Sequence, residues 1–110
     1  MDWHSTIKGF KAYLQLERSL SGNSVEAYLH DVALLKQFME LKYPSLTPDA
    51  VSSAHLQEFI LFINEMGLGD QSQARILSGI RAFYKYLLME DLIKDNPTTL
   101  LEGPKLRRKL

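Results

Sequence analysis

The run SQARILSGIRAFYKYL, residues 72–87, holds the side chains best suited to binding an anion. Apolar and aromatic residues recur along it at helical spacing, which predicts a helix with one buried stripe. Basic and small residues share the opposite side: Ser72, Arg75, Ser78, Gly79, Ala82 and Lys85, with Arg81 at its edge. Guanidinium and ammonium groups bind phosphates, and small residues between them let a helix axis approach a flat surface. The pattern is compatible with a flat, negatively charged ligand, but from the spacing alone an ordinary solvated helix face is the simpler explanation.

Gly79 lies in the interior of this predicted helix, where a glycine costs about 1 kcal/mol relative to alanine. A glycine at such a position usually permits close approach of another group. That group is either the ligand or a neighbouring helix, and the spacing is compatible with both.

A second candidate surface lies upstream, where Ser24, Tyr28, His30 and Asp31 follow Asn23. Ser24 and Asn23 fall at the N-terminus of a predicted helix, where backbone amides and the helix dipole favour a phosphate. Plain N-capping is the simpler role for Asn23. We expect Tyr28 to be half in the core and His30 to be a surface residue.

Charge is unevenly distributed along a chain whose formal net charge is zero. Residues 1–70 carry five basic and nine acidic side chains, a balance of −4, whereas residues 71–110 carry eight basic and four acidic ones, a balance of +4. Four of the last six residues are basic, so the C-terminal segment would supply most of the attraction for an anion. The same tail would also serve as a solubilising terminus.

Several chemistries have no support in the sequence. There is no cysteine, and the three histidines, His4, His30 and His55, fall in different predicted helices without the spacing of metal ligands. No glycine-rich phosphate loop, GxSxG or HExxH motif occurs, so we expect neither catalysis nor a metal or other cofactor. We find no secretory signal and no apolar run near the roughly 18 residues that span a bilayer, which predicts a cytoplasmic location without membrane contact.

Helical periodicity dominates the 110 residues, 45% of which are hydrophobic, and no strand alternation is sustained. We expect one all-α domain, a compact bundle of four main helices plus a short fifth. The first main helix is predicted at about residues 2–18, and the second begins between residues 21 and 23 and ends near 42. The third is predicted at 53–66 and the fourth at 70–91. TTLLE (98–102) is the predicted short fifth helix. The domain is predicted to span residues 1–103, and residues 104–110 to form a basic linker.

The predicted helix ends rest on capping patterns. Ser21 or Asn23 would cap the second helix, and Asn23 has capping-box spacing with Glu26. Gly67 would close the third helix in a left-handed conformation. Asp70 would cap the fourth, with Gln73 three residues later as its capping-box partner.

The stretch SQARILSGIRAFYKYLLMEDLIKDNP, followed by PKLRRKL, resembles the end of the N-terminal core-binding domain of Xer-type tyrosine recombinases and phage integrases. Upstream, FKAYLQLERSLSGNSVEAYLHDV resembles the first helix of that family, its Leu-Ser turn and the Tyr-x-x-Asp-Leu pattern of its second helix. The resemblance covers essentially the whole chain. The residues that match the later motif are Ser72, Arg75, Leu77, Ser78, Ile80, Arg81, Phe83, Tyr84, Tyr86, Leu87, Asn96, Pro97, Pro104 and Lys105.

The resemblance implies a SAM-like bundle that clamps one side of a core recombination site in double-stranded DNA, with its second and fourth helices toward the major groove. Strand cleavage and rejoining would belong to a catalytic domain absent from these residues, and other recombinase subunits would be partners on DNA. The isolated domain would be a monomer. The implied DNA-binding residues are Ser24, Tyr28, Ser72, Arg75, Ser78, Arg81, Lys85, Lys105, Arg107 and Arg108.

One departure weakens the match on the second helix. The family often has Tyr-Arg-Arg-Asp where this chain has Tyr28, Leu29, His30 and Asp31, so a phosphate contact there is reduced or lost. Exposed arginines on the fourth helix predict that Arg75→Ala or Arg81→Ala would weaken DNA binding with little effect on folding.

A protein-interaction bundle is the alternative function. In that case the outward faces of the first and fourth helices would meet a helical partner or a second copy. Exposure of Trp3 or Tyr13 on the first helix, or of Leu100 and Leu101, would favour it.

Overall fold

The computed structural model describes residues 1–99 and 101, and this part of the chain is entirely helical apart from turns and loops. Its elements are α1 (Trp3–Leu16), α2 (Gly22–Lys42), the 3-10 helix η1 (Pro48–Ala50), α3 (Ser53–Glu65) and α4 (Asp70–Met89). The predicted all-α class and its four main helices are confirmed. The boundary of the domain at residue 103 and the linker 104–110 lie outside the described residues.

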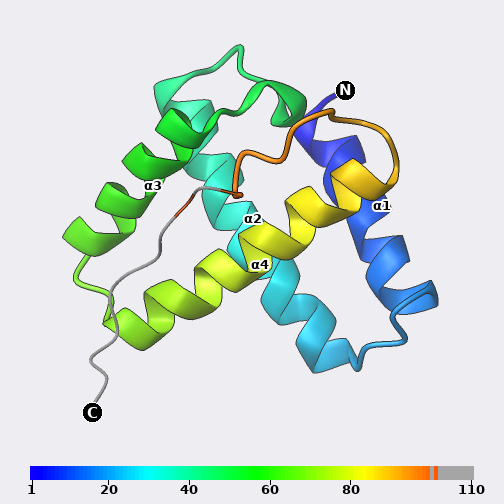
Figure 1. Ribbon diagram of the computed structural model, residues 1–110. Helices are drawn as coiled ribbons and strands as arrows, with labels where there is room; N and C mark the ends of the chain where they lie inside the picture. The colour runs from blue at the N-terminus through cyan, green and yellow to red at the C-terminus, as the bar shows by residue number, and fades with distance from the viewer. Residues whose placement is uncertain (100, 102–110) are drawn as a thin grey trace.

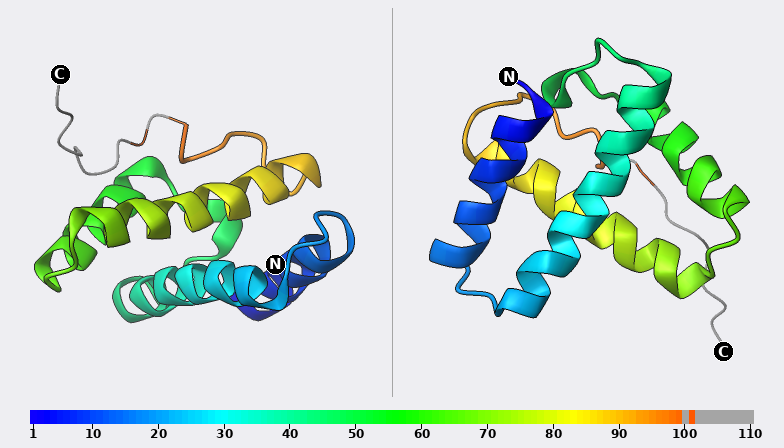
Figure 2. Two further views of the ribbon diagram at one scale, coloured as in Figure 1. Left: turned by 90° about the horizontal axis from the view of Figure 1, so that it is seen from below. Right: turned by 180° about the vertical axis from the view of Figure 1, so that it is seen from behind.

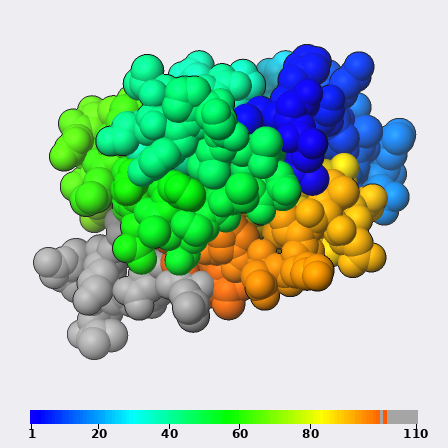
Figure 3. Space-filling view, turned by 90° about the horizontal axis from the view of Figure 1, so that it is seen from above, coloured from blue at the N-terminus to red at the C-terminus, as the bar shows by residue number. Residues whose placement is uncertain are grey.

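The two longest helices, α2 and α4, cross near the centre of the molecule (Figure 1). Seen from below, α4 lies in one layer, while α1 and α2 lie in a second layer against it (Figure 2). Helix α3 closes the bundle beside the C-terminal half of α2. Residues 93–97, which follow α4, lie next to η1 and the start of α3 (Figure 3).

The predicted fifth helix is not formed over the residues that can be seen. Pro97–Thr99 form a turn in which the Asn96 side chain accepts hydrogen bonds from the backbone N–H and the hydroxyl of Thr98. This local bond offers the backbone an alternative to a helix, as asparagine commonly does. The predicted helix also included Leu100, Leu101 and Glu102. Of these three residues, only Leu101 is described.

The first three helices begin at side-chain caps. Asp2 caps α1, Ser21 caps α2, and Ser52 caps α3 in a capping box with His55. Of the two caps considered for α2, Ser21 is therefore the one used. Asn23 lies inside the helix, and the capping box that it was predicted to form with Glu26 is absent from the described hydrogen bonds.

Helix α4 begins differently from the prediction. Gly69 is its N-cap residue and makes no side-chain cap, so Asp70 is already the first helical residue. Gln73 is buried, and its Nε2 donates to the carbonyl of Leu68 at 2.9 Å and to the side-chain oxygen of Asn64 at 3.2 Å. The tight connection between α3 and α4 turns Gln73 inward, where it satisfies the loop carbonyl. Gly67 has φ +86°, as its predicted left-handed role requires.

Aromatic rings fill the core between α1 and α4. Phe10 is fully buried and packs edge-on against Phe83, with ring centroids 5.3 Å apart. Tyr84 is also fully buried, and its hydroxyl donates to the carbonyl of Pro48 at 3.0 Å, which ties α4 to η1. With this stripe of α4 held inward, the opposite stripe that carries Arg75 is turned outward.

Candidate nucleic-acid interface

The crossing of α2 and α4 leaves a shallow depression of about 150 Å³ on the surface. Side chains from both helices line it, so residues about fifty positions apart in the sequence meet there. Four of the six had been predicted as binding residues from the sequence. The lining residues are Ser24, Ala27, Tyr28, Asp31, Arg75 and Ser78.

Arg75 and Asp31 form an ion pair across this crossing. Nη1 of Arg75 lies 3.3 Å from Oδ1 of Asp31 and donates a hydrogen bond of 3.4 Å to Oδ2. The Asp31 side chain is 3% exposed, whereas that of Arg75 is 54% exposed. Burial raises the pKa of the Asp31 carboxyl above its ordinary value, and the nearby Arg75 and His30 partly oppose this rise.

Asp31 was expected on the outward surface of α2, and that expectation was wrong. It points into the crossing because Gly79 of α4 leaves room for it. A Cβ built on Gly79 would lie 2.5 Å from Oδ2 and 2.8 Å from Cβ of Asp31. Gly79 is buried, not outward-facing as predicted, and of the two explanations open for it the neighbouring helix is the right one.

Other predicted residues surround the depression without lining it. Ser72 and Lys85 lie exposed on α4 on either side of Arg75 and Ser78, and neither side chain has a hydrogen bond or ion pair to another described residue. Arg81 is exposed as well, but its Nη2 donates to the carbonyl of Leu101 at 2.8 Å. The Arg81 guanidinium therefore holds the segment that follows α4 against the helix.

Tyr28 is half-buried, as expected, with its ring edge-on to Phe10 at a centroid distance of 6.4 Å. Its neighbour His30 is exposed. The remaining predicted binding residues, Lys105, Arg107 and Arg108, lie outside the described part of the chain. Within that part, no three histidine, cysteine, aspartate or glutamate residues come close enough together to hold a metal ion.

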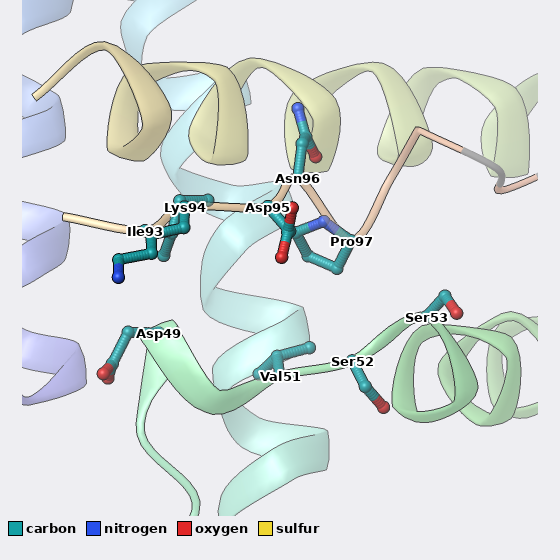
Figure 4. A pocket seen from close by; sticks show the side chains of 9 residues that line it. All are labelled: Asp49, Val51, Ser52, Ser53, Ile93, Lys94, Asp95, Asn96 and Pro97. Atoms are coloured by element: carbon teal, nitrogen blue, oxygen red, sulfur yellow. The ribbon is translucent and has the colours of Figure 1, made fainter. Parts of the chain in front are cut away.

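A larger depression of about 500 Å³ lies elsewhere on the molecule. Figure 4 shows that its walls come from two segments, one from η1 to the start of α3 and the other following α4. No residue predicted for binding lies in it. The side chains that line it are Asp49, Val51, Ser52, Ser53, Ile93, Lys94, Asp95, Asn96 and Pro97.

The features that would have favoured a protein-interaction bundle are mostly buried. Trp3 is 5% exposed, and its indole N–H donates to the carbonyl of Leu46 at 3.0 Å. Leu101 is buried too, Tyr13 is half-buried, and Leu100 is not described. Other large apolar side chains are exposed instead, among them Leu16, Leu41 and Leu61.

Sequence reasoning missed the coupling of Asp31 to Arg75. Two signals were present: an unexplained glycine in the middle of α4, and an acidic residue three positions after the half-buried Tyr28, hence on its side of α2. Neither signal says which residue on the other helix is the partner, because the register of two crossing helices depends on the packing of the whole core.

The fold and this surface define an all-α domain with a mixed basic and small-residue face at the crossing of two long helices. Residues 7–91 match the family described as "Phage integrase, N-terminal SAM-like domain". The chain belongs to this family.

Curated relatives support the assignment. The chain is 37% identical over 108 residues to tyrosine recombinase XerD of Chlorobaculum tepidum. The aligned region covers 98% of the chain and 35% of that protein. It is 35% identical over 104 residues to XerD of Staphylococcus saprophyticus, covering 94% of the chain and 35% of the relative. For tyrosine recombinase XerC of Leptospira interrogans the identity is 33% over 108 residues, covering 97% and 34%. No solved structure gives a significant match.

The chain thus spans about a third of the length of the curated relatives that it matches. The other two thirds of those recombinases have no counterpart in these 110 residues, in agreement with the expectation that the chain is the N-terminal, non-catalytic part. Among the helices described here, none has the length and apolar character needed to cross a membrane.

Proposed function

We propose that this domain binds double-stranded DNA through α2 and α4, as the core-binding part of a site-specific tyrosine recombinase. Strand cleavage and rejoining would come from a separate catalytic domain of the same protein, and other recombinase subunits would join it on the DNA. The domain would act in the cytoplasm, as a monomer before it binds.

The observation that carries this proposal is the convergence of Ser24, Tyr28, Arg75 and Ser78 on one depression. Hydroxyl groups and a guanidinium are the side chains that most often contact DNA phosphates, and arginine also reads guanine edges. Side chains from the two helices line the same depression. Small residues separate the cations on α4, so the helix axis can approach a groove closely.

A second candidate function, contact with another protein, draws on a different surface. Leu41 and Leu61 are 78% and 60% exposed and line a groove between the end of α2 and α3. Exposed apolar side chains along one groove are typical of interaction sites. This surface is separate from the crossing of α2 and α4, so the two functions are experimentally separable.

An amide chemical-shift titration with a short mixed-sequence DNA duplex, at low and then physiological salt, tests both functions. Perturbations confined to residues 24–28 and 72–85 that fade as salt rises would support DNA binding. No perturbation even at low salt would overturn it. Concentration-dependent shifts at Leu41 and Leu61 without DNA would favour protein contact.

Two lysine variants give the titration a matched control. Lys85→Ala removes one cation from the proposed face, whereas Lys11→Ala removes one from the exposed side of α1. Loss of a phosphate contact should flatten the dependence of log affinity on log salt by about 0.9 for Lys85→Ala alone. An equal change in both variants would mean that the domain attracts DNA only through its overall charge.

A further inference from the structure

We propose that Asp31 is a positioning residue that holds the Arg75 guanidinium over the crossing of α2 and α4 so that it meets DNA in a fixed orientation. Asp31 itself would not touch the DNA. The inference rests on the proposed function and assigns a role to a residue that a surface search for DNA contacts would pass over.

Burial separates the two members of the pair. Asp31 is 3% exposed, and its Oδ1 is fully buried without a hydrogen-bond partner among the described residues. A DNA phosphate would be repelled by this carboxylate and has no path to it. Arg75, with 54% of its side chain exposed, reaches from the carboxylate to the surface.

Arg75 keeps most of its binding capacity while it is paired. A guanidinium has five N–H donors in one rigid plane, and only Nη1 contacts Asp31. Nη2 and Nε have no partner among the described residues. One edge of the group is therefore anchored, and the others remain available for a phosphate or a guanine edge.

The protein accepts an unfavourable arrangement at this position. A buried carboxylate is costly unless it is paired, and two long contacts from one nitrogen are modest compensation. Burial accordingly raises the pKa of Asp31. Gly79 adds to the cost, because a glycine in mid-helix is unfavourable and a Cβ there would overlap the Asp31 side chain. A carboxylate buried at this cost is better explained by what it does for Arg75.

The direction in which DNA affinity changes when Asp31 is removed distinguishes a positioning role from a purely electrostatic one. Asp31 is a negative charge near the proposed DNA face, so removing it should strengthen DNA binding if charge alone matters. If Asp31 positions Arg75, its removal frees a long side chain that must be ordered again on binding, and affinity falls. The two explanations predict opposite changes.

The experiment compares wild type, Asp31→Asn and Glu26→Gln by fluorescence anisotropy with one short mixed-sequence duplex. Asp31→Asn should bind about two- to ten-fold more weakly, the effect expected from mobilising one long side chain. Glu26→Gln removes an exposed charge from the same helix and should bind equally or more tightly. Equal or tighter binding by a folded Asp31→Asn protein would overturn the inference while leaving the proposed function intact.

Two further variants keep the test decisive. Adding Asp31→Asn to Arg75→Gln should cause no further loss of affinity, because the group to be positioned is already gone; a further loss would contradict the inference. Arg75→Lys retains both the charge and the buried carboxylate, and should still weaken binding, since an ammonium on a flexible stem lacks the rigid planar fork that is anchored at one edge and open at the others. Wild-type affinity in Arg75→Lys would overturn the inference even if Asp31→Asn did not fold.

A side-chain measurement without DNA distinguishes failure of the two proposals. The Arg75 Nε–H signal should be ordered in the wild type and mobile in Asp31→Asn, as reported by its heteronuclear NOE. An ordered Arg75 in a wild type that binds no DNA would refute the proposed function alone. A mobile Arg75 in the wild type would refute positioning, whatever the affinity.

Discussion

Helix α4 meets α1 through aromatic rings, whereas its crossing with α2 holds a glycine and a buried carboxylate. On the α1 side, Phe10 contacts the rings of Phe83 and Tyr86, with centroids 5.3 and 5.7 Å away. On the α2 side, Asp31 fills the space above Gly79 and pairs with Arg75. The first contact buries large apolar area, and the second buries a charge.

This difference separates stability from function along a single helix. Burying a large aromatic side chain is the strongest ordinary source of folding free energy, while burying a carboxylate opposes folding. The aromatic contact can therefore fix the position of α4, and the polar crossing can then present Arg75. Changes in the two regions should have distinct consequences for folding and for DNA binding.

The largest effect is expected from Phe10→Ala, which removes the centre of the aromatic contact. The side chain is fully buried, so the variant should lose about 3–5 kcal/mol of the free energy of unfolding, measured by urea denaturation. Leu16→Ala, at a position on the same helix that is 79% exposed, is the control and should change stability by less than about 0.5 kcal/mol. Comparable losses in both would mean that α1 does not dock through Phe10.

Gly79→Ala comes next and tests the polar crossing. In an ordinary helix interior this change would stabilise by about 1 kcal/mol, but here the new Cβ would overlap Asp31, and we expect a net loss of about 1–3 kcal/mol. Gly9→Ala offers a comparison, because its Cβ would meet the Tyr86 hydroxyl at the same 2.5 Å. That atom ends a longer side chain, which can move aside, so Gly9→Ala should cost less. The reverse order would show that α2 can shift away from α4.

Gly79 also shows which features of the structure can be predicted from the sequence and which cannot. Its position within a helix and its cost there follow from local pattern alone, as do the four helices and the left-handed Gly67, whereas the pattern left Ser21 and Asn23 both open as the cap of α2. Which group approaches the glycine depends on how two helices cross, and that is set by the summed packing of residues distant in sequence. The outward assignment of Gly79 and Asp31 failed for this reason.

The two arginines of α4 show a related limit of prediction from helical periodicity. Both were predicted to be exposed, and both are, but each also has an intramolecular partner: Asp31 for Arg75, and the Leu101 carbonyl for Arg81. Helical periodicity predicts which face a side chain leaves from, not what a long side chain reaches. Arg75→Ala should therefore destabilise the domain, contrary to the expectation from sequence, because it leaves Asp31 buried without its cation.

A smaller effect is expected from Tyr84→Phe, which keeps the buried ring and removes only its hydroxyl. The Pro48 carbonyl would lose its hydrogen bond, and the free energy of unfolding should fall by about 1 kcal/mol. Thermal unfolding monitored by circular dichroism would measure this loss. If it approached that of Phe10→Ala, the polar link to η1, and not ring packing, would hold α4 in place.

The smallest effect concerns the acid dependence of stability at the polar crossing. Burial raises the folded-state pKa of Asp31 above its ordinary value of 3.8. Between pH 3.8 and this raised pKa, the folded protein therefore binds more protons than the unfolded chain. The contribution of Asp31 to the free energy of unfolding should therefore fall as pH rises from 3.8 through the raised pKa. Asp2 behaves oppositely, since hydrogen bonds from Ser5 lower its pKa, and its contribution is lost on acidification.

Asparagine at position 31 does not titrate, so the difference in stability between wild type and Asp31→Asn isolates this contribution, while that of Asp2 cancels. Urea denaturation at a series of pH values should show the free energy of unfolding of the wild type falling relative to that of the variant as pH rises. Above the raised pKa the difference should become constant. A difference that grows in favour of the wild type would mean that the attraction of Arg75 and His30 outweighs the cost of burial. The polar crossing would then be a stabilising contact like the aromatic one, and the division of α4 into a region for stability and a region for presenting Arg75 would no longer hold.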